Sequence, residues 1–200
     1  MFRILFVLIA FAWSSFQVKA QQIKSLLDNN LYRHTLNYPS HKITFYTQHV
    51  QEIKHAPEGN KFYYWYANNT ISITQGGYSG RLLNGLYSDF FLDKNLKEEG
   101  TFDDGLKEGL WRSWFPGGLL ESSLHYSKGI LKGGFSRYAS SGKLLQEGNY
   151  KNGKLHGSVI NYDSSDSTQI NKYKNGTLQQ VRIKKNRILN LLRRKSNKST

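Results

Sequence analysis

The sequence predicts an all-β protein made of tandem β-hairpin repeats of about 24 residues, stacked into one elongated sheet. Three observations support this prediction. Aromatic residues recur at a fixed period, glycines recur at fixed offsets from them, and turn-forming dipeptides separate short segments rich in aromatic and β-branched residues. Because a single hairpin is only marginally stable in water, such units gain stability by pairing with their neighbours.

The repeat is set by aromatic residues that follow one another at steps of 24, 24, 24 and 23 residues. After each of the first four, a glycine lies at position seven, an apolar residue at nine and a second aromatic at twelve; three units add a leucine at eighteen. The repeating aromatics are Tyr78, Phe102, Tyr126, Tyr150 and Tyr173, and the position-seven glycines are Gly85, Gly109, Gly133 and Gly157. Position nine is Tyr87, Trp111, Phe135 or Val159, and position twelve is Phe90, Trp114, Tyr138 or Tyr162. The position-eighteen leucines are Leu96, Leu120 and Leu144.

Turn signals divide each unit into two strands. The dipeptides Asp104-Gly105 and Asn152-Gly153 are strong hairpin signals, because such turns need positive φ at both central residues. Glycine-containing runs at 116–118 and 140–142 mark the opposite bend. Positions nine and twelve are three residues apart, which does not fit strict alternation on one face, and we expect a β-bulge there.

The first twenty residues have the form of a secretory signal peptide. Arg3 supplies the positive charge, residues 4–12 are an unbroken apolar run, and Val18 and Ala20 stand at the −3 and −1 positions of a cleavage site. The apolar run is too short for a membrane-spanning helix, which needs about 20 residues. We therefore expect a secreted, periplasmic or cell-envelope protein that has no transmembrane span after cleavage.

The rest of the chain divides into three parts. Residues 21–60 show no repeat and are predicted to cap the array, with a short helix at 23–27 and a strand at 42–47. Residues 61–180 are the array, whose first and degenerate hairpin turns at Asn68-Asn69. Residues 181–200 form a basic tail.

The tail holds much of the positive charge. The whole chain has 28 Lys and Arg against 14 Asp and Glu, and residues 181–200 contribute eight of the basic residues and no acidic one. The apolar residues of the tail fall on one side of a helix, a pattern that suits an anionic surface. The alternative is a solubilising cap on the last hairpin. The tail residues expected to contact an anionic surface are Arg182, Lys184, Lys185, Arg187, Arg193, Arg194 and Lys195.

The units resemble a known repeat family. Residues 100–119 and 148–157 resemble the MORN-repeat variant found in bacterial proteins often labelled YwqK-type antitoxins, and the exported, cysteine-free form looks like those of Bacteroidetes-type bacteria. The resemblance covers about 76–180, and less surely 59–75. It implies an elongated hairpin array with a binding role, and it supplies no catalytic residues.

The sequence offers no convincing catalytic, cofactor or metal site. The run Gly148-x-x-x-x-Gly153-Lys154 nearly matches a phosphate-binding loop, but Leu155 replaces the Ser or Thr and no helix pattern follows. None of the six histidines has a metal-ligand spacing. The carboxylate pairs 98–99 and 103–104 are better explained as charged turns and edges than as an acid–base pair.

Three functional hypotheses follow. We favour an exported, non-enzymatic module that binds a protein partner or acts as a scaffold. The second is a peripheral envelope protein that binds anionic lipid or glycan through its tail and an aromatic face, and the third is an inhibitor of a toxin. Export makes nucleic acid an unexpected partner. Aromatic residues that could either line a binding face or form the core are Trp65, Trp111, Trp114, Tyr138 and Tyr162.

The signal-peptide prediction can be checked on the native protein. If signal peptidase cleaves after Ala20, intact-mass spectrometry of the protein from its source cells will give a chain that begins at Gln21. Recovery of a chain that still begins at Met1 would contradict both the cleavage and the export.

Overall fold

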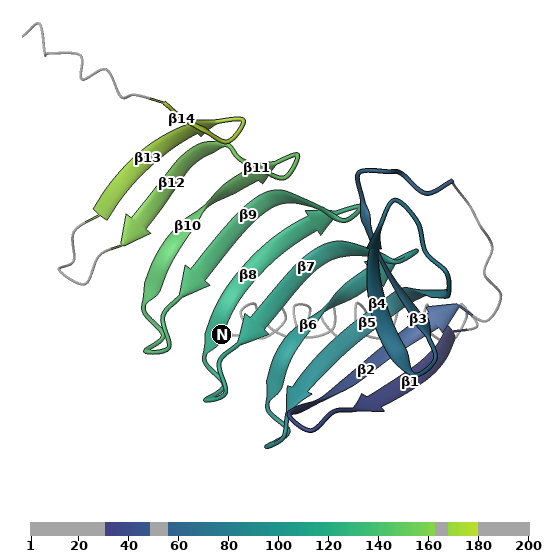
Figure 1. Ribbon diagram of the computed structural model, residues 1–200. Coiled ribbons are helices and arrows are strands. Elements are labelled where there is room, and N and C mark those ends of the chain that lie inside the picture. The colour runs from purple at the N-terminus through teal and green to yellow at the C-terminus, as the bar shows by residue number, and fades with distance from the viewer. Residues whose placement is uncertain (1–30, 49–55, 163–167, 180–200) are drawn as a thin grey trace, which may run out of the picture.

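A computed structural model describes residues 31–48, 56–162 and 168–179, and within these ranges the protein consists of β-strands and turns without a helix (Figure 1). The strands form one 14-stranded sheet in which neighbours are antiparallel. Their bounds are β1 Leu31–Asn37, β2 His41–Gln48, β3 Phe62–Ala67, β4 Thr70–Gln75, β5 Arg81–Phe91, β6 Leu96–Asp103, β7 Leu106–Trp114, β8 Leu120–Ser127, β9 Ile130–Tyr138, β10 Leu144–Lys151, β11 Lys154–Leu155, β12 Gly157–Tyr162, β13 Thr168–Lys174 and β14 Thr177–Gln179.

The strand order confirms the predicted all-β array of hairpins. From β5 to β10 each strand pairs with the next in sequence, and β12, β13 and β14 extend the same path. β1 and β2 form a hairpin whose second strand pairs with β5, so the predicted strand at 42–47 is the second strand of the sheet and joins the β1 edge strand to the array. The expected signal peptide, the helix at 23–27 and the basic tail lie outside the described residues.

Two-residue turns close the hairpins at one end of the sheet. Both central residues have positive φ in the predicted turns Asp104-Gly105 and Asn152-Gly153, as type I′ turns require. The glycine N–H of each such turn donates to a carbonyl of the preceding unit: Gly105 to Leu83, Gly129 to Lys107, Gly153 to Leu131 and Gly176 to Leu155, at 2.7–2.9 Å. These hydrogen bonds tie successive hairpins together at a constant spacing.

The longer turns at the opposite end also repeat. In each of them one residue has positive φ, and this residue is Lys94, Gly118 or Gly142. Its N–H donates to the carbonyl of the residue three positions earlier, at 2.8–3.0 Å. Left-handed backbone favours glycine, so the lysine of the first unit is the exception among these turns.

The position-seven glycines lie where the strand register shifts. Gly109, for example, lies between the pairs Glu99–Arg112 and Thr101–Glu108, whose register differs. All four glycines have positive φ, from 68° at Gly109 to 107° at Gly133. A bulge of this kind bends and twists the strand, and a side chain at positive φ would be strained there.

The side chains at positions nine and twelve point to opposite faces of the sheet. A register shift does lie between them, as expected, but the extra residue is on the partner strand: Lys97, Glu121 or Leu145. Between positions nine and twelve, side chains along β5, β7 and β9 therefore alternate regularly. We call the side that carries the position-nine residues the core face and the other side the open face.

The core face is built by large side chains that pack over glycines of a neighbouring strand. The Trp111 indole lies over Gly100, where an added Cβ would be only 2.2 Å from its ring atoms. Phe135 and Val159 cover Gly148 in the same way, with an added Cβ at 2.9–3.0 Å from them. The exposed fractions of Trp111, Phe135 and Val159 are 2%, 3% and 1%, so glycine lets these side chains reach the sheet backbone.

The β3–β4 hairpin crosses the core face instead of joining the row of repeats (Figure 1). It turns at Asn68-Asn69 as predicted, and β3 also pairs with β5. Its Tyr64 and Tyr66 rings lie 4.8 Å from Phe102 and 5.2 Å from Phe45, respectively. The hairpin thus covers the N-terminal part of the core face.

A lysine is held inside this aromatic core. Lys107 Nζ lies 3.7 Å from the ring centroid of Trp111 and 2.9 Å from Glu98 Oε1, and its side chain is only 15% exposed. Such contacts offset the free energy that a cation loses when it is removed from water. Burial raises the pKa of the Tyr87 phenol, and the negative charge of Glu98 adds to this increase.

The glycine packing gives a stability prediction. Gly100→Ala should lower the free energy of unfolding by about 1–3 kcal/mol, because its Cβ would overlap the Trp111 ring. Gly117→Ala is the matched control, since nothing lies within 4 Å of its added Cβ, and should change stability by less than about 0.5 kcal/mol. Urea unfolding would measure both, and equal effects would contradict the packing account.

Candidate functional site

A continuous row of mostly polar side chains runs along the open face. Each member is paired with the next across neighbouring strands, so all of them point to the same side of the sheet. The row contains both charges, several hydroxyls and, at its C-terminal end, an apolar residue. Its members are Ser88, Glu99, Arg112, Ser123, Ser136, Glu147 and Ile160.

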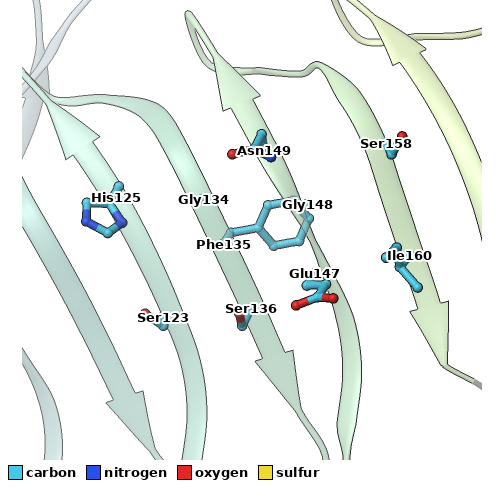
Figure 2. A pocket seen from close by; sticks show the side chains of 10 residues that line it. All are labelled: Ser123, His125, Gly134, Phe135, Ser136, Glu147, Gly148, Asn149, Ser158 and Ile160. Carbon is cyan, nitrogen blue, oxygen red and sulfur yellow. The ribbon is translucent and has the colours of Figure 1, made fainter.

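The C-terminal half of this row forms an open trough of about 540 Å³ (Figure 2). Its lining side chains come from β8, β9, β10 and β12. The trough is hollow because its middle is lined by Ser123, Gly134 and Ser136, which fill little space. Two rows of residues cross it: His125, Gly134, Asn149 and Ser158 form one, and Ser123, Ser136, Glu147 and Ile160 form the other. Most of the side chains that border this concave surface can therefore form hydrogen bonds.

An apolar stripe lies beside the polar row at the end of the sheet where the longer turns are. The position-twelve aromatics alternate in it with the position-eighteen leucines, because each aromatic pairs with the leucine of the next strand. Aromatic residues in successive units are separated by two strand spacings, or about 10 Å. The stripe consists of Phe90, Leu96, Trp114, Leu120, Tyr138, Leu144 and Tyr162, all of them half-buried.

The stripe and the trough meet at Tyr162. Its hydroxyl donates a hydrogen bond to Glu147 Oε1 at 2.7 Å, and this bond raises the pKa of the phenol. The same carboxylate lines the trough. Tyr162 is thereby held with its ring at the edge of the stripe and its polar end toward the polar row.

The structure separates the aromatic residues considered for a binding face. Trp114, Tyr138 and Tyr162 lie together in the stripe, whereas Trp111 is buried on the core face. Trp65 lies on β3, where its Nε1 donates to Thr74 Oγ1 at 2.8 Å and its ring packs against Gly80. Phe90 and the leucines complete the stripe, although they were not among the candidate residues. The basic residues 182–195 lie outside the described part of the chain.

The carboxylate pairs do not converge. Glu98 and Glu99 are consecutive in β6 and point to opposite faces, and Glu98 is paired with Lys107. Asp104 sits in a turn, where it accepts hydrogen bonds from Gln48 and Asn84 at 3.0 and 3.2 Å. Glu98 therefore supports the core and Asp104 supports its turn, whereas Glu99 belongs to the polar row.

The phosphate-loop-like run and the histidines also have structural positions. Gly153 belongs to a type I′ turn between β10 and β11, and its N–H is used by the Leu131 carbonyl. His34 stacks on Phe45 at 5.0 Å and contacts Thr47 Oγ1 at 2.9 Å; burial, with a smaller effect of Arg81, lowers its pKa. Among the described residues no cluster of three or more His, Asp or Glu side chains is arranged to hold a metal.

The residue six positions after each repeating aromatic, here called position six, has a role that the sequence did not reveal. Its residues are Asn84, Glu108, Lys132 and His156. Asn84 donates to Asp104, Glu108 accepts from the Lys128 N–H, and His156 Nδ1 lies 3.5 Å from the Asn175 N–H. Each of these side chains supports the turn of the next hairpin. Amide, carboxylate and imidazole groups can all do this, which explains why no single residue type recurs there.

No protein-family model matches the chain, and no curated protein matches it. In residues 31–48, 56–162 and 168–179 there is no helix with the length and apolarity that crossing a bilayer would require.

Proposed function

We propose that this protein is an exported, non-enzymatic interaction module that binds a partner protein on the open face of its sheet. The observation that carries the proposal is the pairing of the apolar stripe with the polar trough. A hydrophobic strip bordered by hydrogen-bonding groups is the usual composition of a protein interface. Residues such as Trp114, Tyr138 and Arg112 belong to the types that contribute most to binding energy.

The division between the two faces supports this proposal. On the core face Trp111, Phe135 and Val159 are 3% exposed or less, whereas the aromatic residues of the stripe are half-buried and reachable. Small residues such as Ser123 and Ser136 leave the trough open. The core face thus stabilises the sheet, and the open face is available to a partner.

A binding role fits the layout of the polar groups better than catalysis does. The groups of the open face extend in a row over many strands, and the Glu147 carboxylate is engaged with Tyr162. A catalytic site brings an acid, a base or a nucleophile together around one reacting atom. The resemblance of the 24-residue unit to the MORN variant and the expected signal peptide agree with an exported binding array.

Two neighbouring residues provide a direct test. Ser136 points to the open face and Arg137, next to it on β9, points to the core face, where it bonds Gln146 at 3.3 Å. A photoreactive amino acid at position 136 should crosslink a discrete partner in intact cells, and the same group at position 137 should not. The measurement is the adduct pattern on a denaturing gel, with the partner identified by mass spectrometry.

The double variant Trp114→Ala/Tyr138→Ala should reduce the yield of the position-136 adduct, because it removes two aromatic residues of the stripe. Adducts of equal yield from both positions, or an adduct from position 137 alone, would contradict binding on the open face.

A further inference from the structure

A second concave surface lies at the other end of the sheet and carries positive charge. This pocket of about 500 Å³ forms where the β1–β2 turn meets the turn between β5 and β6. Strand pairing brings these segments together, since His41 pairs with Phe91 and Lys42 with Phe90. The surface is thus built by residues far apart in the sequence.

Three cationic side chains line the pocket: Arg33, Lys42 and Lys94. No Asp or Glu is among the described residues that line it. Ion pairs between described residues involve none of these three cations. Like charges that share a concavity repel one another, and an anionic ligand would relieve that repulsion.

An aromatic ring forms part of the wall. Phe90, the first aromatic residue of the stripe, pairs with Lys42 and faces this pocket, and Asn37 and Thr44 add an amide and a hydroxyl. The stacked rings of Tyr38 and His41 belong to the core face, where Tyr38 packs against the buried cluster. The pocket therefore offers cations for an oxyanion, a ring for a flat apolar surface and polar groups for hydroxyls.

The backbone at Lys94 is an independent sign of function. Lys94 has φ +69°, whereas the equivalent residues of the next two units are Gly118 and Gly142. A non-glycine residue in left-handed backbone costs roughly 1 kcal/mol or more, and such strain is often retained at binding sites. Here the strained position places an ammonium group in the wall of the pocket.

We propose that this pocket binds an acidic saccharide, with Arg33, Lys42 and Lys94 holding its carboxylate or phosphate group. Arg33 is suited to bind an oxyanion through two hydrogen bonds, while the lysines act as point charges. The sugar ring would contact the Phe90 ring. The inference does not depend on the protein partner proposed above, because its three cations lie outside the polar row and the stripe; Phe90 belongs to both surfaces.

Lys94→Gly gives a sharp test because it should not unfold the protein. The change converts this turn to the glycine-containing form of its sister turns while removing one cation of the pocket. The control is Lys128→Gly, which makes the same substitution at another positive-φ residue (φ +50°) in a turn that does not line the pocket. Thermal melts of both variants would confirm that the fold is retained.

Isothermal titration of the purified native protein with trigalacturonate should show saturable binding, and neutral maltotriose should show none. Lys94→Gly should weaken trigalacturonate binding about tenfold, as expected for the loss of one charge-assisted hydrogen bond, and Lys128→Gly less than about twofold.

Four results would overturn the proposal. They are no binding of trigalacturonate, equal weakening by both lysine variants, inorganic phosphate binding as tightly as the saccharide, and binding detected only to vesicles that contain anionic lipid. Equal weakening would indicate attraction to overall charge, and the last two would indicate a bare-anion site and a lipid-headgroup site, respectively.

Discussion

The packing of the Trp111 indole onto Gly100 is the contact on which much of this architecture depends. A sheet one layer thick has little volume in which to bury side chains, so large residues must lie flat against the backbone of a neighbouring strand. Glycine permits this approach because it has no Cβ. Trp111 in turn contacts Phe102, at 4.9 Å between ring centroids, and the buried ammonium of Lys107. The β3–β4 hairpin adds Tyr64 to this group and closes the N-terminal part of the core face.

The backbone carries the same repeat as the core. Each two-residue turn sends its glycine N–H to the preceding hairpin, and each position-seven glycine marks a shift of strand register. Position-six side chains add contacts from one hairpin to the next turn. Stability in such an array is expected to come mainly from contacts between neighbours, so local losses weaken one interface at a time. The packed side chains occupy the core face, and the open face carries the trough and the stripe on which we propose that a partner binds.

The sequence could predict the repeat, its period and its turns because glycine and turn dipeptides respond to local backbone geometry. The residues of the stripe, which are the position-twelve aromatics and the position-eighteen leucines, were also visible in the sequence as a repeat. The sequence could not show that these aromatics and leucines alternate in space, because each leucine is separated from its aromatic partner by a turn and a register shift. Trp111 and Trp114 looked equivalent because a bulge between them would have put both on one face, whereas the extra residue lies on β8 and alternation from Trp111 to Trp114 is regular. The cationic pocket was less accessible still, because Arg33 and Lys94 meet only through pairing of distant strands.

The assignment of Trp111 to the core face and Trp114 to the open face is the central claim, and paired alanine variants test it most directly. Urea unfolding of Trp111→Ala should show a loss of about 3–5 kcal/mol, as expected for removal of a buried tryptophan. Trp114→Ala should lose about 1 kcal/mol, since half-buried residues contribute less. Equal losses, or a larger loss for Trp114→Ala, would contradict the division of the sheet into a core face and an open face.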